Sequence, residues 1–367
     1  MKSMRRSTAL LGAAVLLAGL EVAPATAANP KIASICSMDL GSITGQGNYV
    51  DQVVSAASPP AASERRVGPQ VAKPGETRAS STWEFSKESD GGIADRGYAI
   101  YDTWLYSTLI ARPPDGVWWG QGNIQDGMGD FTALARSGYP KGANPQREYL
   151  YGLRNDGVLL RWKNDSTGFH PLGSFAGFSA VKTMTLISQT ATYDTLLATT
   201  RGGALYTIRI AVTSPMTTVV KAVRTSTWQG FEAIVAEKCG SQSTLLTAID
   251  RDTGSAYLYA VGHANGSATV IQALGKVPGT YTDPVYFLRT SRDGSRCPAN
   301  RRYSSGSQRT SRRLTRPLVT RTPSERRLCS CSSPTSSAGT PEARITRHHG
   351  TPPPYSRMIA PTCRGPP

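Results

Sequence analysis

The chain has 367 residues, with 41 Lys and Arg against 25 Asp and Glu, and its formal net charge is +16 at pH 7. A hydrophobic content of 39% over this length is enough for a packed core, so a wholly disordered chain is excluded. No apolar run reaches the roughly 18 residues that suggest a membrane span.

The positive charge is concentrated at the C-terminal end of the chain. Residues 1–27 carry +2, residues 28–288 carry +1 from 22 basic and 21 acidic residues, and residues 289–367 carry +13. A neutral central part favours recognition by shape, aromatic faces and hydrogen bonds over polyanion binding. Nucleic acid is therefore expected as a partner only if the basic segment is native.

The first residues have the order of a secretory signal peptide. Lys2, Arg5 and Arg6 precede an apolar stretch over residues 9–20, and Ala25-Thr26-Ala27 follows as a small-residue cleavage site. The sequence therefore predicts cleavage near Ala27 and an extracellular, bacterial-type protein.

Residues 28–82 are expected to form an N-terminal arm and a Pro/Ala/Ser-rich linker. Segments such as Pro59-Pro60-Ala61-Ala62 bury too little apolar surface to offset the entropy of ordering them. Cys36 and Cys239 are the cysteines that precede the basic tail. An exported protein meets an oxidising environment, so these two residues are a possible disulfide pair.

Residues 83–288 contain two interleaved repeats. An aromatic–x–small–aliphatic motif starts at Phe131, Phe178 and Phe231, and a looser copy starts at Tyr281. A second motif recurs as Leu105-Tyr106, Leu159-Leu160, Leu205-Tyr206 and Leu258-Tyr259. Two marks that share a period of about 50 residues indicate a repeat architecture.

Each repeat unit reads as about four short strands separated by turns such as Asn155-Asp156-Gly157 and Gly202-Gly203. Four antiparallel strands per period predict an all-β fold of β-propeller-like repeats with four-stranded blades. The sequence holds about four such units, and the termini on either side are expected to be disordered. The alternative is a β-sandwich of short strands, which does not require this period.

Residues 289–367 break the pattern, with 16 Arg, no Lys, no Phe and no Trp. Such a segment cannot form a core. A GC-rich gene read out of frame yields this composition, so we expect an out-of-frame tail, further blades lost after Leu288 and an incomplete ring. The alternative is a genuine disordered cationic arm.

The catalytic and metal motifs in the chain are weak. Asp252-Thr253-Gly254 spells an aspartic-protease motif, but it has no second copy and lies where a hairpin turn is expected. Asp250 and Asp252 resemble the start of a calcium loop that lacks its downstream Glu. We therefore expect no enzyme, no metal and no cofactor.

Aromatic or apolar residues stand three positions before the motif phenylalanines, at Met128, Phe175 and Trp228. These residues either pack between adjacent blades or offer a stacking face for a sugar ring.

These features resemble tachylectin-like β-propeller lectins, in which an aromatic–x–x–Phe segment, an Asn-Gly or Gly-Gly turn and a Leu-Tyr strand repeat. Trp228-Gln229-Gly230-Phe231, Gly202-Gly203-Ala204-Leu205-Tyr206 and Asn155-Asp156-Gly157-Val158-Leu159 carry the resemblance. It implies pockets for N-acetylated sugars between neighbouring blades. The candidate sugar-binding residues are Trp228, Gln229, Phe175, Asp130, Asn155 and Asp156.

The sequence therefore predicts a secreted, non-enzymatic carbohydrate-binding protein with repeated weak sites that act through avidity on glycans. The alternatives are a secreted enzyme or sensor on a propeller scaffold, and a structural interaction protein with no sugar site.

Overall fold

The structure is a computed structural model that describes residues 36–141, 145–241, 243–262 and 266–292. The expected signal peptide, residues 1–27, lies outside the described residues, as does the tail from residue 293 onward. All described residues belong to one compact unit. Every helix or strand assigned within them is a β-strand, which confirms the all-β prediction.

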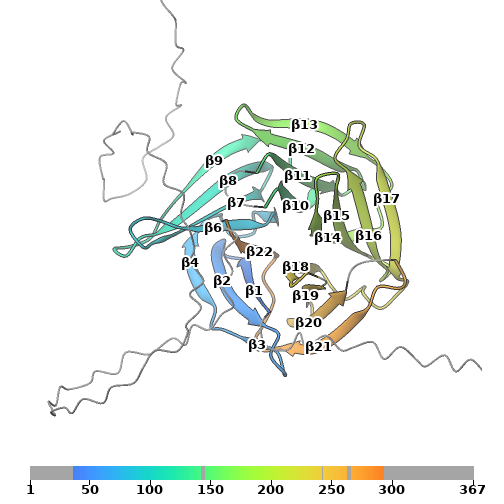
Figure 1. Cartoon of the computed structure of the whole chain (residues 1–367). Helices are drawn as coiled ribbons and strands as arrows, with labels where there is room; N and C mark the ends of the chain where they lie inside the picture. The colour runs from blue at the N-terminus through green and yellow to red at the C-terminus, as the bar shows by residue number, and fades with distance from the viewer. Residues whose placement is uncertain (1–35, 142–144, 242, 263–265, 293–367) are drawn as a thin grey trace, which may run out of the picture. The chain divides into compact units, whose positions relative to one another are not determined.

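The strands form five four-stranded blades rather than about four (Figure 1). Three blades are separate sheets, and the other two are joined into one larger sheet by the parallel pairing of β22 with β6. Within each blade the strands run antiparallel from the inner strand to the outer strand, which confirms a propeller. In blades 1 and 2 one strand position is divided between two short strands that pair with the same neighbour.

The bounds of the strands follow, each blade from inside to outside. Blade 1 consists of β22 (Val285–Ser291), β1 (Ser37–Ile43), β2 (Asn48–Ser55) and the divided β3 (Ala61–Ala62) and β4 (Arg66–Gln70). Blade 2 consists of the divided β5 (Thr77–Ser80) and β6 (Trp83–Lys87), then β7 (Ile93–Tyr101), β8 (Trp104–Arg112) and β9 (Trp118–Gln125). Blade 3 consists of β10 (Phe131–Tyr139), β11 (Arg147–Arg154), β12 (Leu159–Asp165) and β13 (Gly168–Phe175). Blade 4 consists of β14 (Val181–Gln189), β15 (Tyr193–Thr200), β16 (Leu205–Ala211) and β17 (Thr218–Arg224). Blade 5 consists of β18 (Ala233–Cys239), β19 (Ser243–Asp250), β20 (Ser255–Gly262) and β21 (Ile271–Val277).

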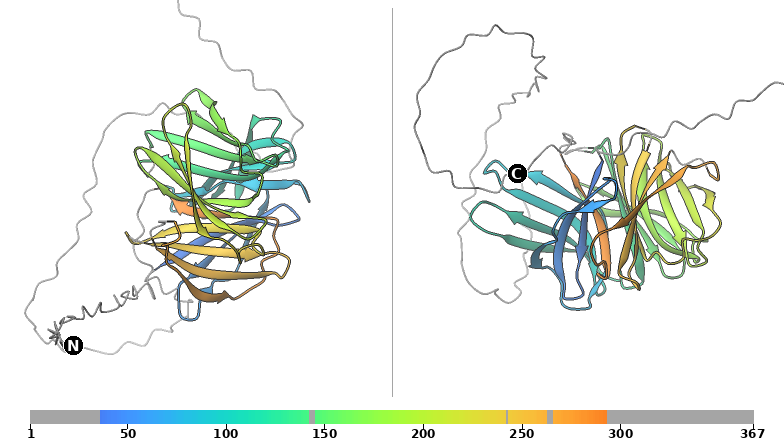
Figure 2. Two further views of the ribbon diagram at one scale, coloured as in Figure 1. Left: turned by 90° about the vertical axis from the view of Figure 1, so that its right-hand side faces the viewer. Right: turned by 90° about the horizontal axis from the view of Figure 1, so that it is seen from below.

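The ring is closed by strands from both ends of the described chain. β22 is the last strand in sequence, yet it pairs with β1, the first, with Leu40 opposite Leu288. Figure 2 shows β22 in orange beside the blue strands of blade 1. The innermost strands contact one another in the cyclic order β22, β5, β10, β14, β18 and back to β22. The expectation of an incomplete ring with blades lost after Leu288 is therefore wrong.

Two predicted domain boundaries change because strands of the propeller extend beyond them. Residues 37–80 contain strands β1 to β5, so the described part of the expected arm and linker belongs to blades 1 and 2. The predicted tail begins at Arg289, but Arg289 and Thr290 are buried in β22. The fold therefore extends to Ser291 at least.

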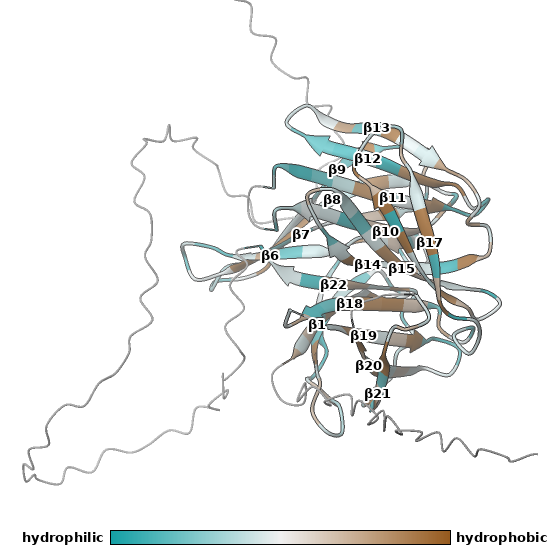
Figure 3. Ribbon diagram, turned by 45° about the vertical axis from the view of Figure 1, so that its right-hand side comes forward, coloured by the Kyte–Doolittle hydropathy of each residue, from teal (hydrophilic) through white to brown (hydrophobic). Residues whose placement is uncertain are grey.

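The core lies between the blades, with one buried apolar cluster at each of the five interfaces. In Figure 3 the hydrophobic colour lies on strands such as β15 and β18, which are largely buried, whereas the outer strand β9 is mostly hydrophilic and largely exposed.

One backbone hydrogen bond recurs in every blade and defines the true repeat. A buried residue that follows each outer strand donates its backbone N–H to a carbonyl in the hairpin between the second and third strands of the same blade, over 2.7–3.1 Å. The five donor–acceptor pairs are Val71–Gly47, Met128–Thr103, Phe178–Gly157, Trp228–Gly203 and Tyr281–Gly254.

The recurring contact corrects the alignment of the repeats. Phe178 occupies the position of Met128 and Trp228, whereas the sequence motif had matched it to Phe131 and Phe231. The next positions along the chain agree, because Val181 donates to Phe178 as Phe131 donates to Met128. Phe175 therefore does not correspond to Met128 or Trp228; it is the last residue of the outer strand β13.

The hairpin glycines permit this contact. Gly157 has φ +84°, and a Cβ atom there would lie 2.1 Å from the backbone nitrogen of Ser179. Only glycine accommodates both the positive φ and the close approach. Similarly, Asp252-Thr253-Gly254 forms the β19–β20 hairpin, where Asp250 accepts a hydrogen bond from the Thr253 N–H, so the hairpin interpretation is confirmed.

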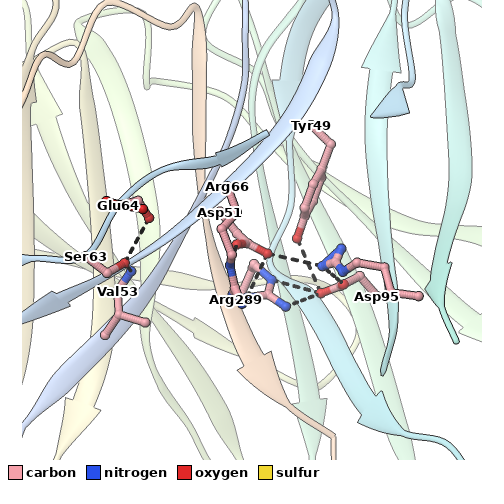
Figure 4. Close-up of polar contacts among 9 residues, drawn as sticks. Tyr49, Asp51, Val53, Ser63, Glu64, Arg66, Asp95 and Arg289 are labelled. Atoms are coloured by element: carbon pink, nitrogen blue, oxygen red, sulfur yellow. Dashed lines mark hydrogen bonds and ion pairs between the residues drawn. The ribbon is translucent and has the colours of Figure 1, made fainter. Parts of the chain in front are cut away.

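A buried charge network locks β22 into the ring (Figure 4). The Arg289 guanidinium lies 2.7 Å from Asp95 of β7 and 3.4 Å from Asp51 of β2. Arg112 reaches both carboxylates, and the Tyr49 hydroxyl donates to Asp95 over 3.3 Å. Burial opposes the charge of Arg289, but Tyr49 and the two carboxylates outweigh it and raise the pKa of Arg289.

Cys36 and Cys239 form a disulfide, with their Cα atoms 5.7 Å apart. Cys36 precedes β1 and Cys239 ends β18, so the bond joins blade 1 to blade 5.

Candidate functional site between blades 4 and 5

Trp228 lies in the core between blades 4 and 5. Its side chain is 5% exposed, and it packs against Phe231 at 5.3 Å and Tyr259 at 5.1 Å between ring centroids. The packing interpretation of this residue therefore applies, and its ring offers no open face to a sugar.

The other predicted sugar-binding residues lie at the exposed end of the blades that carries the hairpins. Asn155 donates to Asp130 through its side chain over 3.2 Å and through its backbone over 2.9 Å. Asp156 pairs with Arg154, and Phe175 is 40% exposed. The structure thus brings Asp130 and Asn155 together. Gln229 lies apart from them, at the interface between blades 4 and 5, where its backbone carbonyl accepts a hydrogen bond from the Lys182 ammonium.

The opposite end of the blades shows a difference between two consecutive interfaces. The two blades can be aligned on the hairpin between their second and third strands. In this alignment Tyr149, Tyr151 and Arg161 of blade 3 correspond to Thr195, Leu197 and Thr207 of blade 4. All six residues lie on the face that each blade turns to the next. Blade 4 therefore presents much smaller side chains at these positions.

The large residues of blade 3 fill their interface with blade 4. Arg161 is buried and donates to the backbone carbonyls of Ala211 and Thr213 over 2.6 and 2.8 Å. Its guanidinium lies 4.9 Å from the ring centroid of Tyr149. The hydroxyl of Tyr151 donates to Asp194 over 2.7 Å, and burial is the main cause that raises the pKa of Tyr151 well above its usual value.

A buried ion pair completes the interface between blades 3 and 4, and it too is missing one interface on. Arg147 of blade 3 lies 2.7 Å from Asp194, which is fully buried. The matching positions one blade further on hold Tyr193 and Thr244. A tyrosine and a threonine do not reproduce the ion pair of Arg147 with Asp194, so that attraction is missing from this part of blades 4 and 5.

A groove opens where these residues are small. It is part of a cavity of about 450 Å³ that also includes one mouth of the central channel, where the ends of β10, β14, β18 and β22 line it. We call it the 4/5 groove. Its blade 4 wall contains Tyr193, Thr195, Thr207, Arg209 and Lys221, and its blade 5 wall contains Lys238, Ser243, Thr244 and Val261.

The 4/5 groove is lined by convergent hydroxyl groups and cations. Thr195 and Thr207 are buried beneath its surface, and Ser243 and Thr244 face them from blade 5. The Arg209 guanidinium lies over the Tyr193 ring, 4.3 Å from its centroid. This contact holds the guanidinium in place and leaves its N–H groups available, because they donate to no other described residue.

The groove does not carry a metal-ligand cluster. Among the residues that the structure describes, no group of three or more His, Cys, Asp or Glu side chains is placed to hold a metal ion. Across the same ranges, no helix has the length and apolarity to cross a bilayer.

No protein-family model matches this chain, and no curated protein does. Among solved structures, a fungal fucose-recognising lectin from Aleuria aurantia with a six-bladed propeller is similar at a TM-score of 0.38 and 13% identity, over 67% of this chain and 78% of that one. The BP39L lectin from Burkholderia pseudomallei has a TM-score of 0.34 and 16% identity, over 66% and 70% of the two chains. A periplasmic gluconolactonase from Pseudomonas aeruginosa reaches 0.28 and 8%, over 67% and 98%. Similarities this weak do not bear on the function of this chain.

Proposed function

We propose that this protein binds carbohydrate without chemical turnover, and that the 4/5 groove is its binding site. The observation that supports this proposal is the replacement of Tyr149 and Arg161 by Thr195 and Thr207 at the corresponding positions of blade 4. The replacement opens one side of a cavity that, together with the adjoining mouth of the central channel, falls in the size range of small-molecule sites, about 300–1,000 Å³. Hydroxyl and guanidinium groups converge on it, which suits a polyhydroxylated ligand.

This proposal differs from the repeated equivalent sites that the sequence suggested. The blade faces are not equivalent, because the positions of Thr195 and Thr207 hold Asp39 and Asp51 in blade 1 and Leu245 and Leu258 in blade 5. Among blades 1, 3, 4 and 5, the pair of threonines at these positions is therefore specific to blade 4. The hairpin-side residues Asp130, Asn155 and Gln229 remain a second candidate, since they are exposed polar groups.

Filling the groove tests the proposal. We expect Thr207→Arg to abolish binding on a glycan array, or to weaken it at least tenfold, about 1.4 kcal/mol. Between blades 4 and 5 the arginine would fill the space that corresponds to the one Arg161 fills between blades 3 and 4. Thr253→Arg, at an exposed hairpin position, adds the same charge elsewhere and should leave binding unchanged.

Each alternative has a distinct outcome. Loss of binding in an Asn155→Ala, Gln229→Ala variant, with Thr207→Arg unaffected, would move the site to the hairpin side. Release of sugar from a bound glycan would indicate an enzyme. If the folded wild-type protein bound no glycan on the array, the carbohydrate proposal would be wrong.

A further inference from the structure

The charges of the 4/5 groove are strongly unbalanced. Arg209 and Lys221 project from blade 4 and Lys238 from blade 5, and all three are exposed. No carboxylate in the described part of the chain lies within 4.0 Å of any of these three cations; the nearby carboxylates pair with other residues. Three cations from two facing sheets thus line one cavity, and none of them forms an ion pair within the described part of the chain.

The two acids on the groove lining do not neutralise these cations, because each already has a cationic neighbour. Glu84 lies 3.2 Å from Arg136, and Glu237, which is buried, lies 3.9 Å from Lys141. The structure therefore leaves Arg209, Lys221 and Lys238 to interact with solvent or with a ligand.

The spatial order of the three cations suits one anionic group. In the sheet of blade 4, Lys221 lies opposite Thr207 and Arg209 lies opposite Thr195, so each cation flanks one of the small residues that open the groove. Lys238 lies opposite Thr244 on the facing wall. Arg209 is also fixed by Tyr193, and a positioned guanidinium binds carboxylate or sulfate through two parallel hydrogen bonds.

We infer that the 4/5 groove selects an acidic saccharide, one that carries a carboxylate or sulfate group, and that Arg209, Lys221 and Lys238 recognise that group. This inference rests on the proposed function and adds the ligand class. The threonine and serine hydroxyls contact the neutral part of the sugar, and the cations contact the acid.

The test compares short oligosaccharides of matched length on the full chain by calorimetry. The probes are tetragalacturonate, a sulfated galactose tetramer and neutral galactotetraose. We expect at least one acidic probe to bind about tenfold more tightly than the neutral one, and its affinity to fall as salt rises. The two acidic probes distinguish carboxylate from sulfate recognition.

Charge removal separates the groove from the basic C-terminal segment, which every variant retains. In Arg209→Gln, Lys238→Gln we expect the preference for the acidic probe to fall to about twofold or less, because the charge-assisted bonds are lost. The control Lys87→Gln, Lys276→Gln removes two exposed cations outside the groove and should keep the preference.

The possible results are distinguishable. Equal binding of acidic and neutral probes would overturn this inference and leave the proposed function standing. An acidic preference that survives in Arg209→Gln, Lys238→Gln would assign it to other cations and would also overturn the inference. Failure of every probe, together with a blank glycan array, would remove the proposed function itself.

Discussion

Replacing Arg289 with methionine is expected to lower the free energy of unfolding by about 3–5 kcal/mol. The guanidinium is almost fully buried and interacts with Asp95 and Asp51, which are themselves buried. Methionine has a similar volume but leaves the buried Asp95 to the partly exposed Arg112, and the buried Asp51 to Arg112 and the exposed Arg66. Urea unfolding followed by tryptophan fluorescence measures the loss.

The matched control is Arg66→Met. Arg66 also pairs with Asp51, at 2.7 Å, but its side chain is 61% exposed. An exposed pair contributes about 1 kcal/mol or less, so this variant should stay close to wild type. Equal losses in the two variants would show that burial of Arg289 does not set its contribution.

Arg289 also shows where the sequence misleads. Composition places it in an Arg-rich segment with no core-forming pattern, and it is separated from Asp95 by 194 residues. Only the pairing of β22 with β1 and β6 makes the role of its charge visible. A long-range partner of this kind leaves no local signal in a single sequence.

Blade 1 was not predicted from the sequence for a different reason. The motif search depended on large aromatic side chains, and blade 1 uses Val71 where the following three blades use Met128, Phe178 and Trp228. The strands themselves could have been predicted, because residues 37–43 and 48–55 are apolar-rich runs on either side of a Gly-containing turn. The repeat period, the four strands per unit and the hairpin glycines were readable because each depends on local turn chemistry.

The site was the least predictable part. Aromatic residues suggested stacking faces, but Trp228 contributes more by filling the space between blades. The groove exists because the side chains of Thr195 and Thr207 are small. That size difference is informative only after the blades are aligned strand by strand. The aligned sequence would then have shown Thr207 in the place of Arg161.

Removal of the disulfide is expected to be as costly as loss of Arg289. Cys36 and Cys239 close a loop with a sequence separation of 203 residues, and the chain-entropy model gives about 5 kcal/mol for a loop of this length. We expect Cys36→Ala, Cys239→Ala to lower the free energy of unfolding by about 2–5 kcal/mol, measured by urea unfolding without reductant.

Reductant provides the internal control, because within the described residues the Cys36–Cys239 disulfide is present in the wild type and absent from the variant. Treated wild-type protein should approach the stability of the double variant, whereas the variant should not respond. The bond joins blade 5 to blade 1, the same junction at which β22 completes the first blade. If the ring were held there by β22 pairing and the Arg289 network alone, the double variant would unfold at the wild-type urea concentration.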